Sequence, residues 1–300
     1  MNNKQYNLTE YKIVAKSALR RFRMNITLVL SVVWIFFFVN GNIYAQTYEE
    51  LINQFYVYEE KNDLPAAEEC LKAAMRLEPA NRLNFALLTN LGTIQRRQGN
   101  LIEALLSYST ALNQQPKNEM ILENRAILYT EMGEMVLALN DYQTLLTINP
   151  HNEEALYQRG LLYMRSENLI LAEMDFERIM EINHETVKGR LGFALLEKVR
   201  QNYTESEEIL NYLINKNPDY LLLYEERAEL YFLTNRRSRA MADLNKVFAE
   251  TPNPSAELYV LRGRVKLAQY EKASAAIDFR KALLLGYDAE SIENLLKQTY

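Results

Sequence analysis

A pattern of small and apolar residues recurs about every 34 residues from Tyr48 almost to the end of this 300-residue chain. The clearest copy, residues 88–116, has the skeleton Leu88, Leu91, Gly92, Ala104, Tyr108, Ala111 and Pro116. On one common frame the copies start at residues 48, 85, 119, 153, 187, 221 and 256. Such a period indicates a small structural unit that must stack on its neighbours to bury its apolar face. The repeat therefore limits the possible folds more than any other feature.

Small residues occupy two fixed positions of the frame, the eighth and the twentieth. The eighth position holds Gly92, Ala126, Gly160, Ala194, Ala228 and Gly263, and the twentieth holds Ala67, Ala104, Ala138, Ala172, Ser206, Ala240 and Ala275. Helices that cross closely need small side chains where they touch. We expect two helices per copy, with a helix-breaking turn between them and a proline after the second. In the fourth copy His184 takes the proline position, which makes it a helix-end residue rather than a ligand.

The skeleton resembles the tetratricopeptide repeat, in which Leu-Gly, Ala, an aromatic residue, Ala and Pro recur in a 34-residue frame. This resemblance implies an all-α, right-handed superhelical solenoid of seven helix pairs, which we assign to residues 46–287. It also implies a binding scaffold. Residues 288–300 predict a C-terminal capping helix, with Asp288 or Ser291 as its N-cap.

The N-terminal 45 residues differ from the repeats and indicate export. Residues 1–25 carry six bases and one acid, and residues 26–39 form an uncharged apolar segment. Fourteen helical residues span about 21 Å, which is short for a bilayer core, so a signal peptide cleaved before Gln46 is favoured. An uncleaved signal anchor is the alternative. Both predict repeats outside the cytoplasm, in a periplasm or attached to an inner membrane, with membrane contact only through this segment.

Charge and residue usage argue against several kinds of function. The leader accounts for +5 of the total charge of −5, so residues 46–300 carry −10, which disfavours nucleic acid. The single cysteine, Cys70, excludes an internal disulfide and is expected to be a buried, unreactive filler. With two histidines and no metal, nucleotide or nucleophile motif, we predict no enzyme activity, no catalytic residue, no metal and no cofactor.

Charged residues recur at two positions that should face a partner helix. Four copies pair an arginine at the seventh position with an aspartate at the twenty-third: Arg125 with Asp141, Arg159 with Asp175, Arg227 with Asp243 and Arg262 with Asp278. The second copy has Leu91 and Ser107 instead. Because a charge between helices is costly unless it is paired, we predict four structural ion pairs.

The first helix of each copy should line the inner wall of the solenoid, where a protein or peptide would bind. The predicted groove residues are Tyr56, Thr89, Thr93, Arg96, Glu123, Asn124, Ile127, Tyr157, Leu161, Leu195, Glu225 and Glu229. Asn124 also matches the central Asn of the two-carboxylate clamp of chaperone-binding repeats, but Glu154 would repel a carboxylate. We therefore expect an adaptor in envelope assembly or signalling. The alternative is an envelope enzyme, or a glycan or small-molecule binding protein, with its site in the groove.

Overall fold

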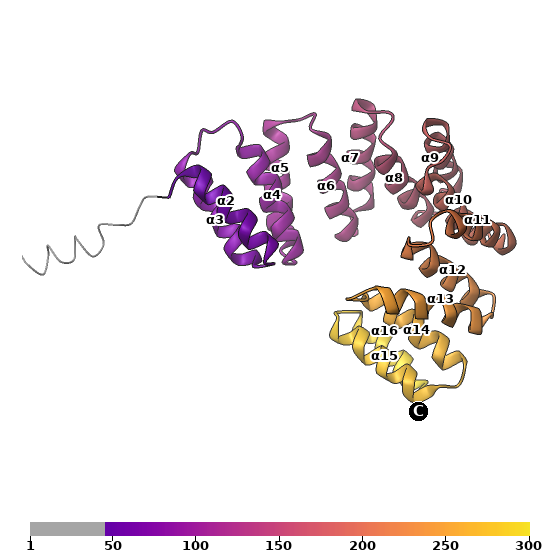
Figure 1. Ribbon diagram of the computed structural model, residues 1–300. Helices are drawn as coiled ribbons and strands as arrows, with labels where there is room; N and C mark the ends of the chain where they lie inside the picture. Colours follow the sequence, from indigo (N-terminus) through magenta and orange to yellow (C-terminus); the bar gives the residue numbers. More distant parts are fainter. Residues whose placement is uncertain (1–45) are drawn as a thin grey trace, which may run out of the picture. The chain divides into compact units, whose positions relative to one another are not determined.

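The computed structural model describes residues 46–300, which form two compact units divided between Gln98 and Gly99. Unit 1 contains helices α2 to α4, and unit 2 contains α5 to α16 (Figure 1). The predicted leader, residues 1–45, lies outside the described residues.

All fifteen elements of the described part are α-helices, and no strand occurs among these residues. The first helices of the pairs are α2 (Tyr48–Glu60), α4 (Asn84–Arg97), α6 (Glu119–Glu131), α8 (Glu153–Arg165), α10 (Val187–Val199), α12 (Leu221–Leu233) and α14 (Ala256–Ala268). The second helices are α3 (Leu64–Leu77), α5 (Leu101–Gln114), α7 (Met135–Ile148), α9 (Leu169–Ile182), α11 (Tyr203–Lys216), α13 (Arg237–Glu250) and α15 (Lys272–Leu284), and α16 (Ala289–Lys297) follows alone. The predicted all-α class with seven helix pairs and a terminal helix is confirmed.

One residue with positive φ stands between the two helices of every pair. These residues are Asn62, Gly99, Gly133, Glu167, Gln201, Asn235 and Tyr270, with φ from 57° to 81°. The left-handed conformation suits Gly and Asn but is strained for other side chains. The turn therefore keeps this backbone geometry in every pair, even where the residue in this conformation is a glutamate, a glutamine or a tyrosine.

The second helices of the first six pairs end in the same way. Each has a C-cap residue that is followed by proline or, after Asn183, by His184. Proline ends a helix because it has no N–H to donate. His184 is exposed at this helix end, as the repeat frame predicts.

The core of unit 1 forms where α2, α3 and α4 meet. Phe55, Leu71 and Ile94 are almost completely buried there, together with Ala67. Cys70 belongs to the same cluster, and burial raises the pKa of its thiol above the usual value. The prediction of a buried cysteine is confirmed, and its thiol is disfavoured as a nucleophile because the reactive form is the thiolate.

In unit 2 the small residues lie where the frame places them, against bulky side chains of the second helix. A methyl group added at Gly160 would come within 2.5 Å of Phe176, and one added at Gly263 would come within 2.5 Å of Phe279. Both phenylalanines are fully buried. Only glycine permits this separation of the two helices.

The terminal helix α16 covers the last pair. Its Ile292 is fully buried with Phe279 and Ala282, and the side chain of Asp288 caps the helix by accepting a hydrogen bond from the N–H of Ser291. The predicted capping role is thus fulfilled, with Asp288 as the N-cap. None of the helices that the structure describes is long and apolar enough to span a lipid bilayer.

Candidate functional site

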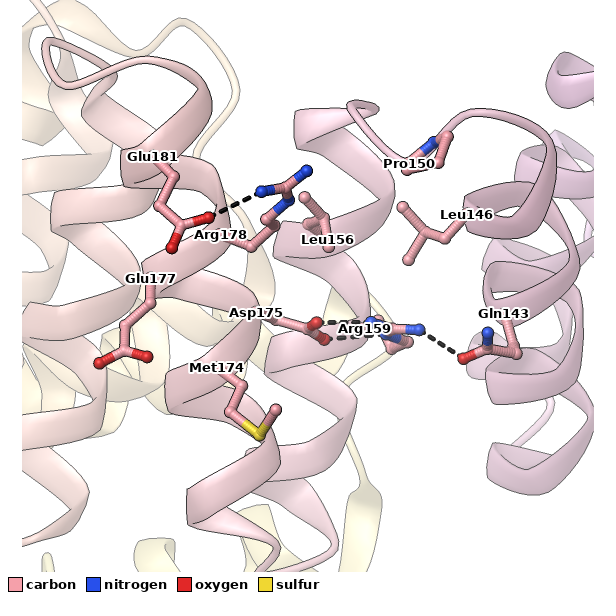
Figure 2. Close-up of a pocket in the computed structure, with 10 residues that line it drawn as sticks. All are labelled: Gln143, Leu146, Pro150, Leu156, Arg159, Met174, Asp175, Glu177, Arg178 and Glu181. Atoms are coloured by element: carbon pink, nitrogen blue, oxygen red, sulfur yellow. Dashed lines mark hydrogen bonds and ion pairs between the residues drawn. The ribbon is translucent and has the colours of Figure 1, made fainter.

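A polar bridge joins three helices in unit 2. Arg159 on α8 donates from Nε and Nη2 to the two carboxylate oxygens of Asp175 on α9, at 2.9 and 2.5 Å. Its Nη1 donates to Gln143 Oε1 on α7 at 2.6 Å, so one guanidinium links the second helices of two successive pairs (Figure 2). The fork of donors in arginine makes this three-way contact possible.

The same bridge recurs at two other pairs. Arg125 binds Asp141 at 2.7 Å through two nitrogens and Ser109 at 3.3 Å, and Arg227 binds Asp243 at 2.8 and 2.7 Å and Asn211 at 2.7 Å. In every case the neutral acceptor lies sixteen residues before the arginine and the aspartate sixteen residues after it. The arginine is therefore a link between pairs as well as within one.

The fourth ion pair, between Arg262 and Asp278, has different neighbouring residues. Arg262 binds Asp278 at 2.8 and 2.6 Å, but Lys246 occupies the preceding acceptor position and cannot accept a hydrogen bond. The guanidinium of Arg262 instead lies 3.5 Å from the ring centroid of Phe248. Lys266 adds a second cation to Asp278 at 2.7 Å, which leaves this carboxylate the most heavily paired of the four.

Burial decides how these pairs act on stability. Burial raises the pKa of Asp175, and Arg159 acts in the opposite direction without overcoming it. Burial also acts to lower the pKa of Arg159, but its hydrogen bonds to Asp175 raise that pKa overall. Desolvation and pairing act in opposite directions on both groups, so an intact buried pair adds little net stability while loss of one partner is costly.

A pocket of about 470 Å³ lies beside the Arg159 bridge. Figure 2 shows Leu146 and Pro150 on one side of it and Met174 and Glu177 on the other. Its polar groups are largely paired with each other, since Arg159 is fully engaged and Arg178 binds Glu181 at 2.7 Å. The pocket is a consequence of how two pairs join, and its chemistry does not define a ligand.

Carboxylates gather on the first-helix face of unit 2. Glu123 on α6 is half-buried, and burial raises its pKa, with the neighbouring Glu154 adding to the effect. Glu154 itself pairs with Lys188 on α10, which lowers the pKa of that carboxyl in spite of its burial. Glu123 has no such direct partner among the described ion pairs.

A second group of acids lies further along the same face. Glu225, Glu226 and Glu229 on α12 line a pocket of about 300 Å³ together with Glu257 and Arg264 of α14. Lys198 on α10 binds Glu226 at 2.6 Å and Glu229 at 2.5 Å. Burial raises the pKa of Glu225, and Glu226 adds to this rise. The pocket therefore keeps an excess of negative charge.

Eight predicted groove residues lie in unit 2, but they are not equally accessible. Glu123, Asn124, Ile127, Leu161, Glu225 and Glu229 are half-buried and can contact a partner. Tyr157 and Leu195 are only 9% exposed and belong to the hydrophobic core. They are core residues rather than exposed contact residues, since α8 and α12 both pack against α10 and both side chains belong to the core of these helices.

The four predicted groove residues of unit 1 also differ. Tyr56 is well exposed, and Thr93 and Arg96 are half-buried. Thr89 is 4% exposed, and its hydroxyl donates to the backbone oxygen of Phe85 at 2.7 Å. Thr89 therefore fills an internal position of the helix packing and is removed from the surface set.

The sequence reasoning missed several charged residues of this face. Lys198, Glu257 and Arg264 stand at the twelfth, second and ninth positions of their copies, which are positions assigned to the groove. The signal for them is in the sequence, because the repeat frame places each one at a groove position. Within residues 46–300 no group of histidine, cysteine, aspartate and glutamate could hold a metal ion.

Stacked helix pairs, small-residue contacts and a half-buried polar face on the first helices define a helical-repeat protein-interaction scaffold. A tetratricopeptide repeat protein from Parabacteroides merdae is 60% identical to the chain, with a TM-score of 0.73, and the match covers 85% of this chain and 99% of that protein. The chain belongs to the tetratricopeptide repeat family.

More distant solved structures share the fold. Yeast Tom70 is 16% identical with a TM-score of 0.61, over 78% of this chain and 52% of Tom70. PilW, a widely conserved type IV pilus biogenesis factor, is 18% identical with a TM-score of 0.55, over 72% of this chain and all of PilW. No protein-family model and no curated protein matches the chain.

Proposed function

We propose that the chain is an exported, non-enzymatic scaffold of a bacterial cell envelope that binds a protein partner on its first-helix face. The observation that carries the proposal is the mixture of half-buried carboxylates and apolar side chains on that face, in a chain of this repeat family. Such a mixture suits a peptide or a helix, because apolar side chains fill pockets while charges fix the register. We propose that the chain acts through this binding as an adaptor in envelope assembly or signalling.

The charges of the face suggest which partner surface it accepts. Partial burial raises the pKa of Glu123 and of Glu225, and neighbouring glutamates add to the rise at both residues. A lysine or arginine of a partner would pair with such a carboxylate and offset the free-energy penalty of its desolvation. We therefore expect the partner to present basic side chains next to apolar ones.

Binding is tested with residues 46–300 immobilised in two charge-reversed forms. The double variant Glu225→Lys and Glu229→Lys should lose a partner that the unchanged protein captures from envelope extract. The matched control is Glu205→Lys with Glu208→Lys, which makes the same charge change on exposed residues of α11. Equal capture by both variants would place the binding surface elsewhere, and capture of a glycan or small molecule instead of protein would favour the alternative function.

Export is supported by the basic and apolar segments of residues 1–45 and by the bacterial source of the 60% identical relative. It is tested by adding protease to cells whose outer membrane has been opened. The repeats should be degraded while a cytoplasmic marker survives. Survival of the repeats together with that marker would show that they are not exported, and this outcome is independent of the binding experiment.

A further inference from the structure

We propose that the outer side of α15 binds the surface of a membrane that contains anionic lipids. Four exposed side chains, two apolar and two basic, form this side of the helix: Ile277, Arg280, Lys281 and Leu284. We call these four residues the α15 stripe. Ile277 is 65% and Leu284 80% exposed, so both apolar side chains are accessible. Basic and large apolar side chains together on an exposed helix are typical of a helix that lies on a membrane.

The spacing of the stripe places it on the side of α15 that faces away from the core. The two bases follow Ile277 by three and four residues and precede Leu284 by four and three residues, which puts all four on one side of a helix. Phe279 and Ala282 are fully buried on the opposite side, where Ile292 of α16 belongs to the same cluster. The stripe is therefore left open to solvent after the helices have packed.

The stripe has no exposed acid on its own helix. The one acid of α15 is Asp278, which is only 2% exposed and is paired with Arg262 and Lys266 of α14. A third base, Lys272, is exposed at the start of the helix. The helix α15 thus presents three positive charges to solvent and no negative charge.

The surrounding part of the chain is also positive when every charge is counted. Residues 236–300 contain eleven bases and eight acids, a net charge of +3, whereas residues 46–235 carry −13. The eight acids include those nearest to α15 in the sequence, which are Glu271, Asp288, Glu290 and Glu293. Because charges in water are screened over about 8 Å at physiological salt, the acids of distant pairs have little effect at the stripe.

The packing of helix pairs does not require these side chains. The position of Leu284 holds a polar residue or alanine in the other six second helices: Arg76, Asn113, Thr147, Glu181, Asn215 and Ala249. The two bases stand where α11 has Asn211 and Tyr212. Since these helices form the same kind of pair, the stripe is an addition to the last pair that the fold itself does not explain.

An anionic lipid surface fits the stripe better than other anionic partners do. It can attract the bases with its headgroups and receive Ile277 and Leu284 at the boundary of the acyl chains. A nucleic acid would leave both apolar side chains in water, and a second copy would bring its own net charge of −10 against the first. The sequence alone predicts membrane contact only through residues 1–45, so the stripe adds a second contact.

The test is sedimentation of residues 46–300 with lipid vesicles, either of phosphatidylcholine alone or of equal parts phosphatidylcholine and phosphatidylglycerol. The protein should bind the anionic vesicles and not the neutral ones. The double variant Arg280→Gln and Lys281→Gln should weaken binding about 30-fold, since each base near an anionic surface contributes about fivefold. Ile277→Ser with Leu284→Ser should weaken it at least about 10-fold, because two apolar side chains no longer enter the interface.

The matched control is Lys117→Gln with Lys216→Gln, which makes the same charge change on exposed residues outside α15 and should leave binding unchanged. Circular dichroism and the unfolding midpoint of each variant show that the fold is kept. No preference for anionic vesicles, or an equal loss in the control, would overturn the proposal. A dimer of the lipid-free protein that the Arg280 and Lys281 variant abolishes would assign the stripe to a second copy and overturn the lipid assignment.

Discussion

Replacement of Asp175 by alanine tests the energetic role of the arginine bridges. The substitution leaves Arg159 between α8 and α9 with 15% of its side chain exposed and without its carboxylate partner. Removal of one member of a buried ion pair costs about 3–5 kcal/mol, and because Arg159 keeps Gln143 we expect the lower end, about 3 kcal/mol. Asp278→Ala should cost more, since it strands both Arg262 and Lys266.

The chain itself supplies the compensating variant. The second copy has Leu91 and Ser107 at the two positions of the bridge, so Arg159→Leu with Asp175→Ser should fold almost as stably as the unchanged protein, within about 1 kcal/mol. Glu181→Ala is the surface control, because it removes the exposed pair with Arg178 and should change stability by less than about 0.5 kcal/mol.

The assay is urea unfolding of residues 46–300 followed by circular dichroism at 25 °C. A free-energy loss below about 0.5 kcal/mol for Asp175→Ala would show that the pair is not buried in solution. A loss for the double variant as large as that for Asp175→Ala alone would refute the reasoning in another way. It would mean that the stranded charge is not what destabilises the single variant.

Three further predictions concern other parts of the fold. Tyr270→Gly should stabilise the protein by about 1 kcal/mol, since it relieves a positive φ at an exposed side chain, and Gly133→Ala should destabilise it by a similar amount; thermal unfolding checks both. Gly192→Ala should cost about 1–3 kcal/mol in the urea assay, because its methyl group would lie 2.4 Å from the buried ring of Phe176, and an unchanged midpoint would contradict this contact. Because burial raises the pKa of Glu225 in the folded protein above the ordinary 4.5, its contribution to stability should fall as the pH rises from about 4.5 through that raised pKa. Glu225→Gln should therefore stabilise the protein more at pH 7 than at pH 4, and equal effects at the two pH values would contradict the shift.

Much of the helix packing could be predicted from the sequence, because every copy of the repeat has to pack its two helices against each other at the same positions. The places where helices touch accept only small residues, so Gly160 and Gly263 mark these contacts directly. Charges between helices need a partner, so an arginine and an aspartate sixteen residues apart indicate that they meet. These features depend on neighbours within one pair or the next, which the repeat frame fixes.

The exposure of the groove residues could not be predicted in the same way. The frame assigns Tyr157 and Leu195 to an open wall, but their exposure depends on how closely successive first helices approach. Gly192 lies at the sixth position, outside the repeated skeleton, and it brings α10 against Phe176 of α9. Burial raises the pKa of Tyr157 on α8, and the next contribution comes from Glu226 on α12, two first helices away. The sequence of a single copy does not determine how closely the first helices of successive copies approach each other.

The fifth helix pair shows how neighbouring pairs can pack together without an arginine–aspartate bridge while the fold is kept. It has Phe193 where four other copies have arginine, and this ring packs edge-on against Phe176 with centroids 6.2 Å apart. Within the pair, the buried hydroxyl of Ser206 donates to the backbone oxygen of Ala194 at 2.7 Å. Apolar contact and one neutral hydrogen bond therefore replace a charged bridge. Because a buried ion pair adds little net stability over such packing, the two solutions can alternate along one chain.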